Sequence, residues 1–353
     1  MIAEQERLAP AAHDDLDGVP SPAESGAPVG HDAIWETLAG AYGKDRLPQG
    51  LILAGPSGIG KATLAFQFAR YLLLNPVPRE ALQTGPQFDV PESLFRQVAS
   101  GAHPGILHIR RPFNQRSKTF RTRITADEVR AIGRFLSHTS GDGGYRIVIV
   151  DPAEDMNIHA ANALLKILEE PPANTIFLLI AHAPGRLLPT IRSRCQMLRM
   201  TPVDSASMAE VMRRLEVPQP PNGDVERITN LAEGSVRRAI LLLAFGGLDI
   251  AEAIEGLLKN QNFDLQSARA AAASVGGRGS DDAFDQFNRL IDDTLTEFAH
   301  RYAIDGNGET ANRLAGYHGE FNEAVESVRT FNLDRRHHVV KTLRDLHGML
   351  HRK

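Results

Sequence analysis

Residues 55–63, GPSGIGKAT, nearly match the loop that binds the phosphates of a nucleotide. That pattern requires a glycine, four residues and then Gly-Lys-Ser/Thr, and Gly55, Gly60 and Lys61 occupy the matching positions. In such a loop the backbone amides from Gly58 onward face an anion at the start of a helix, where the helix dipole favours negative charge. Lys61 would reach the outer phosphates. The spacing therefore predicts a phosphate-binding loop.

Two positions that ATP hydrolysis requires carry unsuitable residues. Ala62 replaces the Ser or Thr whose hydroxyl holds Mg²⁺, and Thr63 lies about 100° further around the helix. Asp151 ends the apolar run YRIVIVD and stands where a magnesium-binding aspartate is expected. It is followed by Pro152, which can neither accept a proton nor orient a water, and Glu154 is interpreted as a charge near a helix start. We therefore expect that the site does not hydrolyse nucleotide.

Apolar runs alternate with amphipathic stretches in the first 200 residues, which predicts a parallel α/β sheet covered by helices on both faces. Buried strands are predicted at 50–55, 145–151 and 175–182. Helices are predicted at 31–47, 61–74, 125–136 and 157–172, and residues 75–120 are expected to be irregular. The third helix begins with a capping box, Thr125 and Glu128. Because a strand precedes the glycine loop and a helix follows it, a nucleotide site is favoured over a simple surface turn.

Beyond residue 202 the strand signals end and helical periodicity continues to the C-terminus. The N-terminal segment is rich in Pro, Ala, Asp and Ser, which is typical of disorder. GGLD at 246–249 suggests a hinge. We expect four parts: a disordered tail at 1–28, an α/β domain at 29–202, a small helical lid at 203–246 and a helical domain at 247–353.

The composition excludes some classes of protein. Net charge is −4, with 39 basic against 43 acidic side chains, so no global basic excess indicates a nucleic-acid binder. No apolar run approaches the roughly 20 residues of a membrane-spanning helix, and the N-terminus lacks the pattern of a secretory signal. Cys195 is the single cysteine and is expected to be a small packed residue, so an internal disulfide and a cysteine-cluster zinc site are excluded. We expect a cytoplasmic protein without a membrane partner.

One local charge run stands out between residues 110 and 123. Its members are Arg110, Arg111, Arg116, Lys118, Arg121 and Arg123. A solvated loop or hairpin is the favoured interpretation. Contact with DNA phosphates is the alternative.

Four segments occur in an order that resembles the clamp-loader branch of the AAA+ proteins. They are GPSGIGKATLA, VDPAEDMNIHAANALLKILEEPP, LLPTIRSRC and EGSVRRAI. Within that branch the chain is most similar to bacterial subunits of the delta-prime kind, over about residues 29–245. The resemblance implies an AAA+ α/β domain, a helical lid and a C-terminal helical collar for assembly. It also implies partners: the other clamp-loader subunits (gamma/tau and delta), the sliding clamp and, through the complex, primed DNA.

The resemblance implies roles for single residues. Arg194 in SRC matches the arginine finger that acts in trans on a neighbouring subunit's ATP, for which a planar, bidentate guanidinium is suited. A structural ion pair is its alternative. Arg237 in GSVRRA matches the arginine that reads nucleotide from the lid, and Arg238 beside it leaves that choice open. A degenerate site for ATP or ADP would be lined by Gly55, Gly58, Gly60, Lys61, Asp151 and Arg237.

Several features of catalytic family members are missing. Those members carry a four-cysteine zinc module, whereas this chain has only His103 and His108 in the corresponding region, so we expect no zinc. They place a glutamate where this chain has Pro152 and a small polar residue close to the position of His182. We therefore expect the chain's own ATPase activity to be absent or very weak. The alternatives are an active clamp-loader ATPase of the gamma/tau kind and an unrelated P-loop NTPase.

Overall fold

The computed structural model describes residues 7–81, 84–137, 144–217, 220, 223–276 and 281–351. The chain forms two compact units and passes from the first to the second between Arg238 and Ala239, within helix α9. This boundary lies before the hinge that the sequence suggested at 246–249. The four-part organisation expected from the sequence stays a prediction. None of the described helices is both long enough and apolar enough to cross a membrane.

The first unit is built on a five-stranded parallel sheet with strand order β2-β5-β6-β1-β7. The strands are β1 (Gly50–Ala54), β2 (Ile106–Ile109), β5 (Arg146–Val150), β6 (Thr175–Ala181) and β7 (Gln196–Arg199). A short antiparallel pair, β3 (Phe113–Asn114) and β4 (Thr119–Phe120), follows β2. The helices are α1 (Asp32–Gly43), α2 (Lys61–Leu74), α3 (Glu92–Ala99), α4 (Ala126–Ser137), α5 (Ile158–Glu169), α6 (Pro189–Arg192), α7 (Ser205–Arg214) and α8 (Val225–Leu231), with the start of α9 (Val236–Ala244). Single 3₁₀ turns are η1 (Pro78–Glu80), η2 (Ala153–Asp155) and η3 (Pro184–Arg186).

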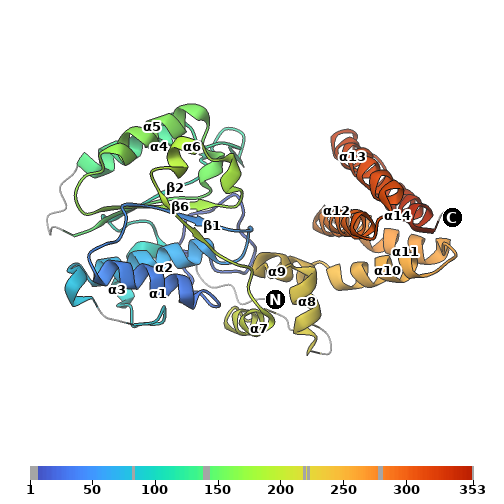
Figure 1. Cartoon of the computed structure of the whole chain (residues 1–353), viewed down its shortest axis with the longest axis horizontal. Helices are drawn as coiled ribbons and strands as arrows, with labels where there is room; N and C mark the ends of the chain where they lie inside the picture. Colours follow the sequence, from blue (N-terminus) through green and yellow to red (C-terminus); the bar gives the residue numbers. More distant parts are fainter. Residues whose placement is uncertain are drawn as a thin grey trace. The chain divides into compact units, whose positions relative to one another are not determined.

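Alternate residues of the central strands enter two separate cores, as a sheet covered on both faces requires. In β1, Leu51 and Leu53 belong to the core under α1 and α2, whereas Ile52 belongs to the core under α4 and α5. Figure 1 shows these helix pairs on opposite faces of the sheet. The first core is filled by aromatic rings, among which Trp35 and Tyr71 meet edge to face with centroids 5.4 Å apart. This packing fixes the ends of β1 and β5, where the candidate site lies.

The described residues of the second unit form helices joined by short connections, with no strand among them. Its helices are the end of α9, α10 (Gly247–Lys259), α11 (Leu265–Val275), α12 (Asp281–Ile304), α13 (Gly308–Phe331) and α14 (Arg335–His351). Helices α12 and α13 run antiparallel, because Asp285 near the start of α12 pairs with Arg329 near the end of α13 at 2.7 Å. Phe284 and Phe287 are buried in its core.

The predicted strands and helices of the α/β part are confirmed within a few residues, and α2 has the predicted bounds. One half of the predicted capping box is present: Glu128 Oε2 accepts a hydrogen bond from the Thr125 backbone N–H at 2.8 Å, and the Thr125 hydroxyl donates to the same carboxylate oxygen. The expectation of irregular structure at 75–120 was wrong, because α3, β2 and the β3–β4 hairpin lie there. The four-residue strands β2 and β7 lie at the two edges of the sheet, where a short run gives little periodicity.

Candidate nucleotide site

The glycine loop connects the end of β1 to the start of α2, as its sequence predicts. Gly55 donates a backbone hydrogen bond to Ala181 O at 3.1 Å, which fixes the start of the loop to the neighbouring strand β6. Gly58 and Gly60 have φ of +78° and +98°, a region that favours glycine. His31, the residue directly before α1, also fixes the loop, because its Nε2 donates to Ile59 O at 2.6 Å.

The loop is also in contact with the helical segment that ends the first unit. Ser235 Oγ donates to Ser57 O at 2.9 Å, and the Arg237 N–H donates to Gly58 O at 3.3 Å. A Cβ atom on residue 58 would lie 2.5 Å from both Arg237 Cβ and Ser235 Oγ. Gly58 is therefore needed for its conformation and for this close approach.

Lys61 is buried, with 3% of its surface exposed, and its ammonium group is directed back onto the loop. Its Nζ donates to Gly55 O at 2.7 Å and also to Pro56 O. Burial lowers the pKa of Lys61 to about 8, and the negative charges of Asp151 and Glu154 partly oppose that effect. The cation that would reach a phosphate is therefore held by backbone carbonyls of its own loop.

Asp151 follows the end of β5, and its backbone N–H donates to Ile109 O at 2.9 Å. Desolvation and then the charge of Asp14 raise the pKa of its carboxyl, Lys61 opposes the rise, and the resulting pKa is about 7. When no cation is bound nearby, a carboxyl with this pKa is partly protonated near neutral pH. Asp151 and Lys61 thus lie close enough for their charges to interact, in an environment that disfavours both charges.

Glu154 has a structural position that the sequence did not reveal. Its Oε1 accepts hydrogen bonds from the backbone N–H groups of His182, at 2.7 Å, and Ala183, at 3.0 Å. The carboxylate therefore joins the turn after β5 to the end of β6. Burial lowers the pKa of His182, so its imidazole is neutral near pH 7.

The residues present do not fit a magnesium–nucleotide complex well. Ala62 offers no hydroxyl, and its methyl group packs against the core under α1 and α2. Pro152 follows Asp151 without a water-activating carboxylate. Within the described ranges, no three His, Cys, Asp or Glu side chains are grouped so that they could hold a metal ion.

The N-terminal segment lies against this site, although the sequence predicted a disordered tail at 1–28. Residues 7–30 follow a defined path, and Ala9 and Ala23 are buried. Glu24 closes the segment on itself, since its Oε1 accepts from the Leu8 N–H at 2.5 Å and the Ala9 N–H at 3.0 Å. The expectation of disorder is therefore wrong for residues 7–28, and residues 1–6 lie outside the described part.

Arginines of α2, the β2–β3 connection and α9 explain why a polar segment becomes ordered. The buried Arg70 donates to Ser25 O at 2.9 Å and to Ala23 O. Arg110 donates to Pro10 O at 3.1 Å, and Arg237 donates to Asp14 O. These hydrogen bonds to main-chain carbonyls do not depend on apolar side chains, so hydrophobic periodicity could not predict them.

The structure distinguishes the two candidate arginines at the start of α9. Arg237 faces the glycine loop and the N-terminal segment. Arg238 is directed to the end of α8 and the turn that follows it. Its Nη1 is 2.7 Å from Glu233 Oε2, and its Nη2 donates to Leu231 O at 3.3 Å. Of the two, Arg237 is therefore the one placed at the candidate site.

Arg194 lies between α6 and β7, outside the glycine loop. Its Nη2 is 2.7 Å from Glu169 Oε1, and its Nη1 donates to Thr190 O at 3.2 Å. The arginine side chain is 36% exposed and the glutamate 51%. The next residue, Cys195, is buried, and burial raises the pKa of its thiol to about 11, as expected of a packed residue rather than a nucleophile.

The parallel sheet, the glycine loop between β1 and α2 and the helical segment in contact with that loop define a P-loop protein of the AAA+ class. Residues 30–204 match the family described as DNA polymerase III, delta subunit. The chain is 36% identical over 234 residues to DNA polymerase III subunit delta' of Pseudomonas aeruginosa, covering 65% of this chain and 66% of that protein. It is 31% identical to subunit delta' of Escherichia coli (48% of this chain, 47% of that protein) and 27% identical to subunit tau of Bacillus subtilis (74% and 45%).

The chain thus spans from slightly under half to about two thirds of the length of these relatives. A solved gamma subunit-related protein of Thermotoga maritima covers 90% of this chain, and the chain covers 99% of it, with a TM-score of 0.42 and 20% identity. By its sequence relatives, the chain belongs to the delta' family of DNA polymerase III clamp-loader subunits.

Proposed function

We propose that this chain acts in a clamp loader as a subunit that does not hydrolyse ATP. The observation that carries the proposal is the state of the glycine loop. Lys61 is bound to carbonyls of its own loop, and Ala62 and Pro152 replace the groups that hold magnesium and activate water. ATP or ADP at this degenerate site would serve structure rather than turnover.

The mechanistic role we assign to the chain is that of an arginine donor. Arg194 is exposed enough to exchange its contact with Glu169 for the phosphate of a neighbouring subunit. An exposed pair of this kind contributes only about 0–1 kcal/mol, so its rupture costs little. An arginine finger in trans contributes about 10³–10⁵ in rate in phosphoryl transfer.

The partners we propose are the other subunits of the complex named for the relatives, DNA polymerase III, with the sliding clamp and primed DNA reached through that complex. The helical second unit, with the collar role expected for 247–353, is proposed to carry assembly. An active ATPase of the tau kind is the weaker proposal, because it would require the metal-binding hydroxyl that Ala62 lacks.

A steady-state ATPase measurement on the purified chain tests the central claim, with a Lys61→Ala variant as the control for contaminating activity. We expect the two proteins to give the same background. Turnover by the wild-type chain at about 1 s⁻¹ or more, an ordinary enzymatic rate, that is lost in Lys61→Ala would overturn the proposal. Co-purification with polymerase subunits from bacterial lysate tests the assignment to the complex.

A further inference from the structure

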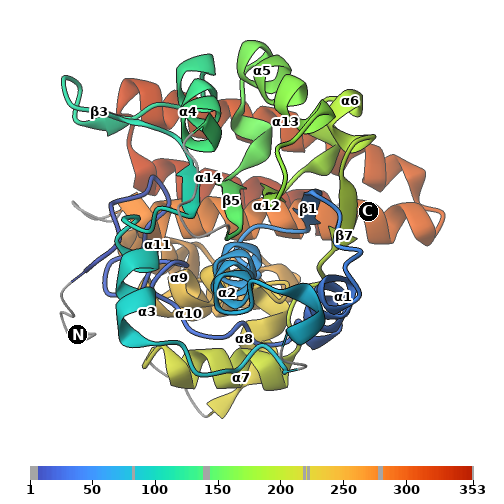
Figure 2. The same ribbon diagram turned by 90° about the vertical axis from the view of Figure 1, so that its left-hand side faces the viewer.

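The β3–β4 hairpin exposes a pair of aromatic rings at the edge of the first unit. Phe113 and Phe120 are directly paired across the two strands, and their ring centroids are 5.0 Å apart in an edge-to-face arrangement. Phe113 is 45% exposed. Figure 2 shows the hairpin projecting beside α4. The hairpin therefore presents one aromatic ring to solvent, supported by the ring of Phe120 beside it.

Positive charge is concentrated on the same hairpin. Residues 110–123 contain six arginines and lysines and no acidic residue, in a chain whose net charge is −4. Arg116, Lys118 and Arg121 are exposed, and among the described residues they form no ion pair with a carboxylate. By contrast, Arg111 pairs with Asp155 and Arg110 binds Pro10 O. The cations at the hairpin tip thus remain available to phosphates.

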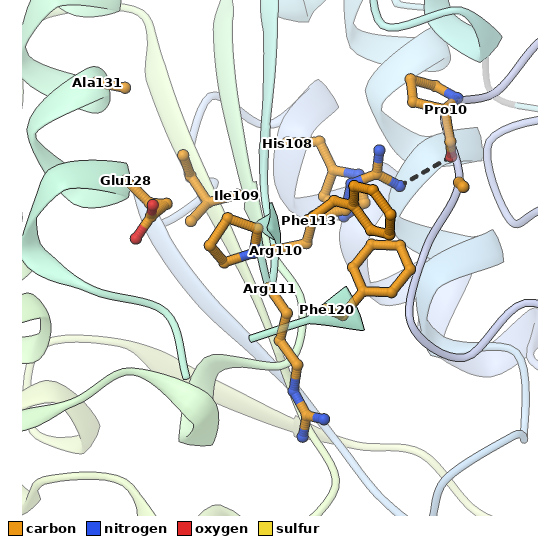
Figure 3. A pocket seen from close by; sticks show the side chains of 11 residues that line it. Pro10, His108, Ile109, Arg110, Arg111, Phe113, Phe120, Glu128 and Ala131 are labelled. Carbon is orange, nitrogen blue, oxygen red and sulfur yellow. Dashed lines mark hydrogen bonds between the residues drawn. The ribbon is translucent and has the colours of Figure 1, made fainter. Parts of the chain in front are cut away.

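A cavity of about 490 Å³ lies beneath the hairpin. Its walls come from the N-terminal segment, β2, the hairpin and α4, and Figure 3 shows the Phe113 and Phe120 rings side by side with Glu128 on the opposite side. His108 Nε2 is buried in the wall without a hydrogen-bond partner. Burial lowers the pKa of His108 to about 3, so the ring is neutral, and it packs edge to face against Phe66 with centroids 5.2 Å apart. Glu128 is already held by Thr125.

We propose that this hairpin and cavity bind single-stranded nucleic acid, with a base against Phe113 at the cavity and phosphates on Arg116, Lys118 and Arg121. Proteins that bind single strands combine exposed aromatic rings with cations, because the rings stack on the bases and the cations bind the phosphates. An acidic peptide could bind the cations, but it would not account for the aromatic rings or the cavity. A duplex would not present an unstacked base. The site requires neither the glycine loop nor a second subunit.

The charges are tested with the full-length chain and a fluorescent oligothymidylate, by anisotropy at several salt concentrations. Replacing Arg116, Lys118 and Arg121 with alanine should weaken binding and reduce the slope of log K against log salt by about 2, which is roughly 0.7 for each lost phosphate contact. The matched control replaces three exposed cations of the second unit, Lys259, Arg269 and Arg289, and has the same net charge. Equal affinity and slope in the hairpin variant and the control would overturn the proposal.

The rings are tested separately. Phe113→Ala should lower affinity about fivefold or more, as the loss of one stacked base does, without changing the salt slope. A Phe113→Trp variant places a local fluorophore in the site, and we expect its emission to be quenched by oligothymidylate but not by an abasic strand of the same length. Binding of the abasic strand, a duplex or polyglutamate as tightly as oligothymidylate would refute a base-binding site. Because the isolated chain is used, these results are independent of clamp loading.

Discussion

The guanidinium of Arg237 donates a hydrogen bond to the main-chain oxygen of Asp14, 223 residues away in the sequence. The backbone N–H of the same arginine donates to Gly58 O in the glycine loop. The N-terminal segment, helix α9 and the glycine loop thus meet at one residue, which family resemblance assigns to nucleotide sensing. Any nucleotide that uses Arg237 must compete with the chain's own segment.

Removal of residues 2–17 should therefore increase nucleotide affinity. The segment would act as an intramolecular competitor, because its removal breaks the hydrogen bond between the Arg237 guanidinium and Asp14 O and takes the charge of Asp14 away from Asp151. We expect fluorescent ADP to bind the truncated chain at least about threefold more tightly than the full-length chain. ATPase activity should stay at background, since Ala62 and Pro152 are unchanged. Equal affinities would show that the segment does not compete.

The charge of Asp14 should be measurable through Asp151. Asp14→Asn removes a negative charge that raises the pKa of Asp151, so carbon-detected NMR should show a lower pKa than about 7 in the variant. A carboxyl whose pKa is raised by folding binds more protons in the folded state, so stability falls as pH rises from about 4 to 7. That fall should be smaller in Asp14→Asn. The exposed Asp17, replaced by asparagine, is the matched control, and an identical shift in both variants would refute a specific interaction.

Much of this site follows from the sequence, and the remainder depends on contacts between distant segments. The glycine spacing and the apolar runs predicted the loop between β1 and α2 and the position of Asp151, because these are local patterns. The binding of Lys61 to Gly55 O, the bridge from Glu154 to β6 and the ordering of residues 7–28 are polar contacts to backbone groups. Such contacts have no periodicity, so the sequence could not reveal them.

Gly58→Ala should destabilise the first unit by about 1–3 kcal/mol, because the position has positive φ and a methyl group would collide with Arg237 and Ser235. Urea denaturation followed by circular dichroism measures the effect. Gly133→Ala is the contrasting variant: Gly133 lies in α4, and a methyl group there meets nothing within 4 Å. Replacing a helical glycine should stabilise the protein by about 0.5–1 kcal/mol. Similar effects of the two substitutions would contradict the proposed role of Gly58.

The contact between Arg194 and Glu169 allows the arginine-finger proposal to be tested against its structural alternative. Arg194→Ala and Glu169→Ala break the same exposed ion pair, and each should change the free energy of unfolding by less than about 1 kcal/mol. If Arg194 is an arginine finger, only Arg194→Ala also removes a guanidinium from a neighbour's ATP. In a clamp loader reconstituted with its partner subunits, we therefore expect Arg194→Ala to assemble normally and to lower DNA-stimulated ATP turnover and clamp loading. Glu169→Ala should leave both rates near the wild-type values.

Arg194→Lys should restore little, because a point charge does not reproduce the bidentate contact. If the two alanine variants lose activity equally, Arg194 acts through its ion pair, and if neither loses activity in a fully assembled complex, the chain donates no finger.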